Sequence, residues 1–185
     1  MFALIDTIAD MLFAPLSGVR KAADLSWKKI MLFFAAMMLM ISFPELRGLF
    51  PNADKVSLLG LAFFQTILFF AFLCILSFGI NGLMNLFYNK SSDIKKILSG
   101  FIFSYTPFLL MPLFMQLPET IYNRQALIAV FSIWNACLFL AAIKNAYDIS
   151  LSSAFVIILL SVFLCVMLNV IFLIYTLMYV GLGIY

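Results

Sequence analysis

The sequence predicts an all-α, polytopic integral membrane protein, with a five-helix transmembrane bundle preceded by an amphipathic N-terminal interfacial helix. Two observations lead to this fold class. First, 66% of the 185 residues are hydrophobic and only 10% are charged, a balance that would leave large apolar surfaces in water if the chain were soluble. Second, the charged residues cluster between long apolar stretches, and a charge at the bilayer centre is costly. The charge-free stretches therefore indicate transmembrane helices.

Five such stretches are expected to cross the membrane within one domain, residues 30–185. The first is short for a hydrocarbon core that needs about 20 residues, but Lys28 and Lys29 before it can snorkel and Trp27 suits the membrane interface. The last stretch, after Asp148, is too long for one straight crossing and too short for two. We expect one span there, followed by a tail. The predicted spans cover about residues 30–44, 57–80, 98–117, 125–143 and 153–175.

Basic residues predict the orientation of these spans. Eight of the eleven Lys and Arg residues fall on the N-terminal side of the predicted membrane, and three fall on the other side. Because cytoplasmic loops carry an excess of Lys and Arg, the N-terminus is expected in the cytoplasm and the C-terminus outside. Lys95 and Lys96 lie in the loop between the second and third spans, where we expect them to face lipid phosphates or an acidic partner.

Residues 1–29 form the expected cytoplasmic leader. On a helix, the side chains of residues 4, 5, 8, 11 and 12 form one apolar face, while Asp6 and Asp10 lie four residues apart on the other face. Pro15 breaks or restarts this helix. The pattern fits an interfacial helix that lies along the leaflet. It also fits a docking helix for a protein partner, to which Asp6 and Asp10 would offer an acidic edge.

The polar residues inside the predicted spans are neutral. The sequence contains no histidine, and no charged residue falls in mid-span, which argues against an intramembrane enzyme and against an ion-coupled carrier. The cysteines show no metal or redox spacing, so we expect no catalytic residue, metal or cofactor. Tyr105, Asn135 and Asn169 remain. The two amides are expected to point into the bundle and bond between helices, because an unpaired amide is costly in hydrocarbon.

Two prolines, Pro107 and Pro112, lie in the third predicted span. Each lacks an N–H and would clash with the carbonyl four residues earlier, so we expect this helix to be bent or interrupted. The hydroxyls of Ser104 and Thr106 are placed to bond the carbonyls that the prolines release. Broken helices form binding sites in some transporters, but no second broken helix stands in a matching position here.

Three local segments carry a resemblance to a known family. These are the leader from Pro15 to Trp27, the sequence Phe-Ser-Tyr-Thr-Pro at 103–107, and Ile-Trp-Asn at 133–135 with the Ala142–Ser150 segment after it. Together with the five-span layout, they resemble the Yip (Ypt-interacting protein) domain family, and the likeness is to a bacterial member of that family. The resemblance implies an all-helical bundle in a bacterial cytoplasmic (inner) membrane, without catalytic residues. Eukaryotic relatives bind prenylated Rab-type GTPases, but no residue-by-residue transfer of that role is possible.

The sequence therefore predicts a non-enzymatic membrane protein that organises or scaffolds lipids or protein partners. Its expected partners are membrane lipids and either another protein or further copies of itself in the membrane. A net charge of +3 is too small to indicate nucleic-acid binding. The alternatives are a small oligomeric transporter or channel, or an accessory subunit of a larger membrane complex.

Overall fold

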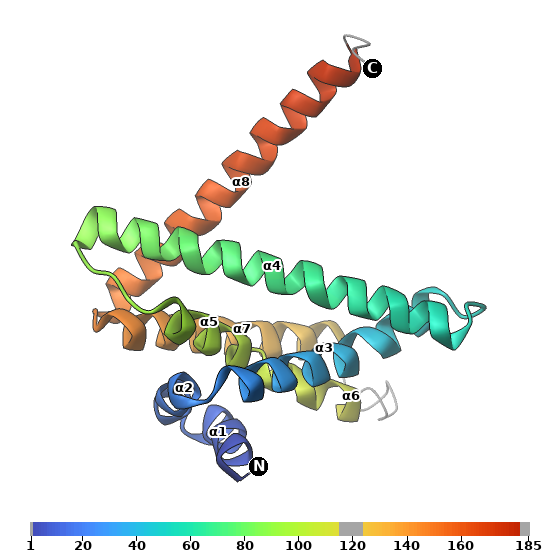
Figure 1. Ribbon diagram of the computed structural model, residues 1–185, viewed down its shortest axis with the longest axis horizontal. Coiled ribbons are helices and arrows are strands. Elements are labelled where there is room, and N and C mark those ends of the chain that lie inside the picture. The colour runs from blue at the N-terminus through green and yellow to red at the C-terminus, as the bar shows by residue number, and fades with distance from the viewer. Residues whose placement is uncertain (1, 115–123, 182–185) are drawn as a thin grey trace.

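The computed structural model describes residues 2–114 and 124–181, and these residues are helical apart from short connections (Figure 1). Three helices are long and apolar enough to cross a membrane: α3, α4 and α7 from Gln125 onward. The elements are α1 (Phe2–Phe13), α2 (Pro15–Asp24), α3 (Trp27–Leu49), α4 (Lys55–Tyr88), α5 (Ile94–Ser104), the 3₁₀ helix η1 (Thr106–Leu110), α6 (Met111–Phe114), α7 (Arg124–Tyr147) and α8 (Leu151–Gly181).

The observed helices run past the predicted span limits. The first span was expected at residues 30–44, but α3 continues from Trp27 to Leu49. A span estimated from gaps between charges stops at the first charge, whereas a backbone helix continues through charged residues at the interface. For the same reason α4 extends over 34 residues, or about 51 Å at 1.5 Å per residue. Because this exceeds a hydrocarbon core of about 30 Å, a crossing by α4 would have to tilt or project beyond the core.

The third predicted span is interrupted, as its prolines predict. The α-helix α5 ends at Ser104, a 3₁₀ turn contains Pro107, and α6 contains Pro112. The Thr106 hydroxyl donates a hydrogen bond to the carbonyl oxygen of Phe103, four residues before Pro107, at 2.5 Å. The Ser104 hydroxyl bonds the Phe101 carbonyl at 2.6 Å. Both hydroxyls thus bond carbonyls near the break, as expected for non-helical backbone away from water.

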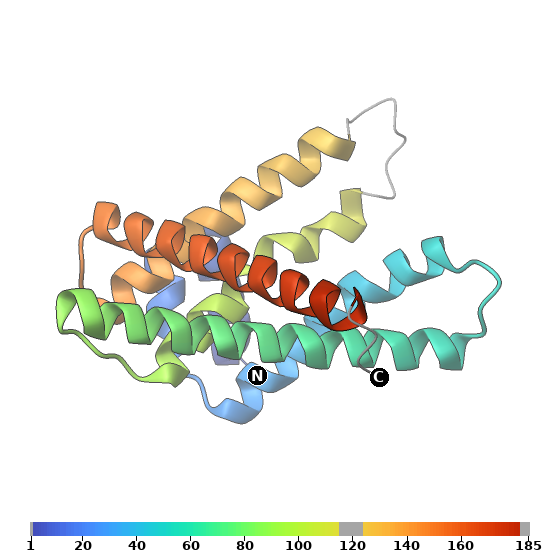
Figure 2. The same cartoon turned by 90° about the horizontal axis from the view of Figure 1, so that it is seen from above.

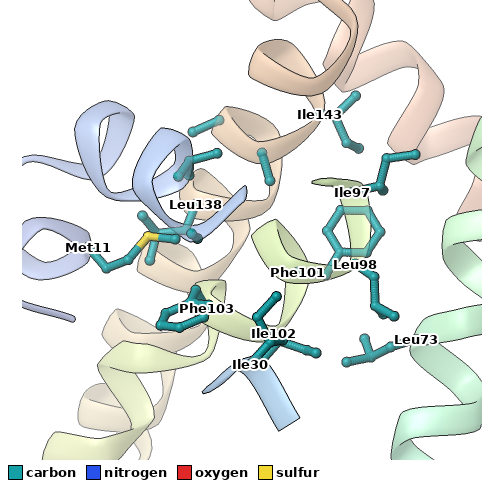
Figure 3. Packing of buried hydrophobic residues seen from close by; sticks show 14 of the residues in the cluster. Met11, Ile30, Leu73, Ile97, Leu98, Phe101, Ile102, Phe103, Leu138 and Ile143 are labelled. Atoms are coloured by element: carbon teal, nitrogen blue, oxygen red, sulfur yellow. The ribbon is translucent and has the colours of Figure 1, made fainter. Parts of the chain in front are cut away.

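Helix α5 lies at the centre of the molecule. Every residue from Ile97 to Ser104 is buried, and α5 contacts α1, α2, α3, α4 and α7. Figure 3 shows its side chains between Met11 of α1 and Leu73 of α4. Phe101 stacks on Phe139 of α7, with ring centroids 4.5 Å apart. This helix is therefore a common packing surface for the leader and the long helices.

The leader is part of this core. Met11, Val19 and Ala22 are almost completely buried and belong to the same apolar cluster as Phe101. Helices α1 and α2 form a hairpin, and α2 packs against α5 and α7. The two helices approach closely at Gly18, where an added Cβ would lie 2.6 Å from the backbone nitrogen of Met11. The leader is therefore more than a strip of helix lying on the leaflet.

Helix α8 follows the last predicted span but is longer than expected. It continues as one helix to Gly181, and its first turns pack against α4 and α7. Ala154 and Ile157 are buried there, whereas the C-terminal half of the helix stands away from the other helices (Figure 1). Its side chains that face outward, such as Phe163 and Ile171, are more than half exposed, which suits contact with lipid.

Gly18 gives a direct test of the leader packing. Gly18→Ala places a methyl group against the backbone of α1, and we expect it to lower the free energy of unfolding by about 1–3 kcal/mol. The control is Gly60→Ala on α4, where nothing lies within 4 Å of an added Cβ. There alanine should stabilise the helix by up to about 1 kcal/mol. Thermal unfolding in detergent measures both, and equal midpoints for the two variants would contradict the close contact.

Candidate functional site

Polar and charged side chains gather at one end of the helix bundle. The loop between α4 and α5 and the turn between α7 and α8 lie together at this end, and the loop between α3 and α4 lies at the opposite end (Figures 1 and 2). The charged end also contains the predicted lysines Lys95 and Lys96, which lie half-buried in the first turn of α5. We call it the charged end from here on.

Asn81 is the centre of a hydrogen-bond network at this end. It lies near the end of α4, and its Oδ1 accepts hydrogen bonds from the Tyr147 hydroxyl at 2.9 Å and from the Ser92 backbone N–H at 3.1 Å. One amide thus connects α4 with the end of α7 and with the loop before α5. Asp93 is the N-cap of α5, because its side-chain Oδ1 accepts a hydrogen bond from the backbone N–H of Lys95 at 2.9 Å.

Lys90 caps the end of α7 from a different segment. Its ammonium group donates to the carbonyl oxygens of Tyr147 at 3.1 Å and Asp148 at 2.8 Å. The last carbonyls of a helix have no partner within the helix and carry partial negative charge. A cation there donates hydrogen bonds to these carbonyls and also interacts favourably with their charge. Asp148 has a positive φ of 48°, which ends α7 sharply and directs the chain into α8. The loop and the turn are therefore held as one unit.

The leader is connected to this unit by a polar contact. The Nε of Arg20 on α2 donates to Oδ1 of Asn145 on α7 at 3.2 Å. Together with the buried contacts of α2, this bond fixes the leader at the charged end. The N-terminal segment therefore packs on α5 and α7 and is hydrogen-bonded to α7.

Within the leader, Asp10 is already paired. Its carboxylate lies 2.7 Å from the ammonium of Lys21 and accepts a hydrogen bond from the Ser17 hydroxyl at 2.8 Å. The hydrogen bonds from Lys21 and Ser17 lower the pKa of Asp10, and the bond to Asp10 raises the pKa of Lys21. Asp10, which was expected to offer an acidic edge, is therefore ion-paired in the folded chain, because α2 folds back onto α1. Asp6 remains exposed.

A pocket of about 310 Å³ opens beside Asp6. Residues of α1, the end of α2 and the start of α3 line it, and its charged members are Asp6, Lys21, Asp24 and Lys29. Trp27, in the first turn of α3, is 43% exposed next to this junction. The volume is at the lower end of the range for small-molecule sites, about 300–1,000 Å³.

The described interior polar groups are mostly satisfied within their own helices. Most buried hydroxyls donate to a carbonyl three or four residues earlier, as Thr66, Ser77 and Ser161 do. Among the described residues, the Ser42 hydroxyl on α3 is buried without a hydrogen-bond partner. The intrahelical bonds direct the hydroxyls toward backbone rather than toward a shared path through the bundle.

Asn135 is the interior amide that connects two elements. Its side chain is 8% exposed on α7 and lies close to the side chain of Tyr105, which follows the last residue of α5. The Tyr105 ring also meets Phe69 of α4 edge-on, with centroids 5.0 Å apart. The prediction that Asn135 faces the bundle is confirmed. The same prediction for the Asn169 side chain falls outside the described part of the structure.

The structure separates the predicted site residues into two groups. Asp6, Asp10, Trp27, Lys95 and Lys96 lie toward the charged end or in its leader, whereas the prolines and the Tyr105–Asn135 pair lie at the helix break. Sequence reasoning missed the pairing partners at the charged end because polar residues near helix ends carry no periodic signal. The missed residues are Arg20, Asp24, Lys29, Asn81, Asn145 and Tyr147.

Among residues 2–114 and 124–181, no group of three or more His, Cys, Asp or Glu side chains is placed to hold a metal ion. Comparison of the chain with protein-family models, curated proteins and solved structures finds no match. The class that the fold defines is therefore an all-helical protein whose long apolar helices suit a membrane.

Asn81 should be essential for the network at the charged end. Asn81→Ala leaves the Tyr147 hydroxyl and the Ser92 N–H without their acceptor, so we expect a loss of about 1–3 kcal/mol in the free energy of unfolding. In the Asn81→Ala variant, adding Tyr147→Phe should lower the free energy of unfolding only slightly further, because the two residues share one hydrogen bond. Asn85→Ala on the exposed side of α4 is the control. Additive losses from Asn81→Ala and Tyr147→Phe would contradict the shared bond.

The Asp10–Lys21 pair predicts a pH dependence of the leader. Because the pKa of Asp10 is lowered in the folded chain, its contribution is present above the ordinary value of 3.8 and is lost as the pH falls through the lowered value. Asp10→Asn should therefore lower the thermal midpoint at neutral pH, and the difference from the unmodified chain should disappear in strong acid. Asp148→Asn is the control outside the leader. A difference that persists unchanged in acid would exclude this ion pair as its cause.

Proposed function

We propose that the protein is a non-enzymatic, five-span membrane protein, similar to the Yip family, that organises lipids or a protein partner at the cytoplasmic face of a bacterial inner membrane. The observation that carries the proposal is the distribution of polar groups. The charged end combines the leader, a hydrogen-bonded pair of loops and an open pocket, whereas most buried hydroxyls of the interior bond to their own helices.

The proposed five spans combine three long helices with two further segments. Helices α3, α4 and α7 have the length and composition for crossing. The interrupted segment from α5 through α6 and the 31-residue α8 would supply the third and fifth crossings. Eight basic residues belong to the N-terminal side in this arrangement. The excess of basic residues supports a cytoplasmic charged end.

Exposed apolar side chains on the leader support its contact with the leaflet. Ile5 is 51% exposed, Phe13 86% and Leu16 52%, although the opposite side of the hairpin is buried in the core. Such a two-sided helix pair can anchor in the interface while its polar groups stay at the headgroup level. The leader then places the pocket and the Asp6 carboxylate in the headgroup region, where both lipids and cytoplasmic partners can reach them.

A small oligomeric transporter is the second candidate function. The observation that favours it is the helix break after α5, with the Tyr105–Asn135 pair beside it, since broken helices form substrate sites in some transporters. In a single copy, however, the break is enclosed by aromatic rings such as Phe69 and Phe139. A path for solutes would therefore require contributions from further copies.

Two measurements test the proposal. A photocrosslinking residue at Ala9, which is exposed on α1, should give discrete protein or lipid adducts in intact membranes. The same residue at Phe64, which is 59% exposed on α4, should give only diffuse lipid labelling. Purified protein in sealed vesicles should also release no ions or small solutes beyond protein-free vesicles. Solute flux together with identical labelling at both positions would replace the scaffold proposal with the transporter.

A further inference from the structure

The pocket beside Asp6 contains charges of both signs, arranged by the ends of two helices. Helix α2 ends at Asp24, and α3 begins two residues after Leu25, at Trp27, with Lys29 in its first turn. A helix C-terminus is partially negative and a helix N-terminus partially positive. The side chains repeat this polarity, because Asp24 stands at the negative end and Lys29 at the positive end. The pocket therefore offers an anionic side and a cationic side within one volume of about 310 Å³.

The pairing of Lys21 determines the remaining charge of the pocket. Its ammonium group already contacts Asp10 at 2.7 Å, so its charge is compensated within the leader. Asp6, Asp24 and Lys29 then remain as the charges that face an occupant. Two carboxylates and one ammonium disfavour a ligand with net negative charge, and they favour one that brings a cation together with an anion.

The position of the pocket along the chain places it at lipid headgroup level. Lys28 and Lys29 precede the apolar part of α3, and Trp27 is 43% exposed beside them. Lysine and tryptophan in this arrangement mark the boundary between hydrocarbon and headgroups. The Ser26 side chain makes no capping bond to α3. The Lys29 N–H donates to the Ser26 carbonyl at 3.0 Å, so Trp27 and Lys28 are the first-turn residues whose N–H groups could face an anion.

We propose that this pocket binds the headgroup of a phosphoethanolamine lipid. The phosphate faces Lys29 and the start of α3, and the primary ammonium faces Asp6 and Asp24. A primary ammonium donates hydrogen bonds to carboxylates, whereas a quaternary ammonium is recognised mainly by aromatic cages. None of the residues that line the pocket is aromatic, which selects ethanolamine over choline. This inference rests on the proposed function, because it specifies the lipid that the charged end organises.

The test uses the full-length chain in a non-ionic detergent. It is titrated with short-chain phosphatidylethanolamine, phosphatidylcholine and phosphatidylglycerol, and lipid adducts are counted by native mass spectrometry. Soluble glycerophosphoethanolamine, which keeps the phosphodiester and the primary ammonium, is titrated separately to distinguish a free headgroup ligand from a lipid. The pocket variants are Asp24→Asn and Lys29→Gln. Their matched controls are Asp148→Asn, at the turn before α8, and Lys28→Gln, the neighbour of Lys29 that does not line the pocket.

We expect the unmodified chain to bind phosphatidylethanolamine about tenfold more tightly than the other two lipids, as one charged hydrogen bond allows. Lys29→Gln should weaken this binding about tenfold. Asp24→Asn should remove the preference over phosphatidylglycerol, because the pocket then carries one carboxylate fewer. Both control variants should bind as the unmodified chain does.

Equal binding of the three lipids, or equal losses in the pocket and control variants, would overturn the proposal. Tighter binding of soluble glycerophosphoethanolamine than of the lipid would replace the lipid with a free metabolite of the same chemistry. If Asp24→Asn lowers the thermal midpoint, Asp6→Asn provides the same charge change from α1, and retained selectivity in a folded Asp6→Asn chain would count against the pocket. Discrete adducts at Ala9 without lipid selectivity would refute the pocket and leave the proposed function intact.

Discussion

A buried helix must satisfy its backbone polar groups within the protein, and the break after the buried helix α5 is where this requirement is hardest to meet. Pro107 removes one N–H and releases the Phe103 carbonyl, which then accepts a hydrogen bond from the Thr106 hydroxyl. The 3₁₀ turn supplies further short-range bonds, such as the Met111 N–H to the Phe108 carbonyl. Because the break is satisfied locally, α5 can end in the middle of the protein and still be enclosed on all sides.

The enclosure of α5 explains why the leader is structural. A short apolar helix buried from Ile97 to Ser104 needs neighbours on every side, and α3, α4 and α7 leave one side open for α2. Gly100 permits the close approach of α7, since an added Cβ would lie 2.8 Å from that of Ala142, and Val19 of α2 packs near the same glycine. Small residues of this kind drive helix association where the hydrophobic effect between helices is weak.

The same division between interior and end decides where chemistry can take place. Polar groups in the interior are used in packing, as the Tyr105–Asn135 pair shows. At the charged end, polar groups instead join separate segments, as Asn81 and Lys90 do. Each loop at this end is held by a hydrogen bond from another segment. A rigid frame with charges of both signs can hold a headgroup in a defined orientation with little cost in conformational entropy.

The sequence by itself determined the helical class, the apolar helices and the break at Pro107. These features follow from composition and from local covalent chemistry, which act within a few residues and need no knowledge of neighbours. The burial of Asn135 was also predictable, because an amide in hydrocarbon must find a partner. Only the tertiary structure decided that Asp10 pairs with Lys21, that the leader covers α5, and that Asp24 and Lys29 face one pocket. Such contacts join residues from different helices, so they depend on which helix faces meet, and an apolar sequence with similar residues on every face leaves that choice to packing.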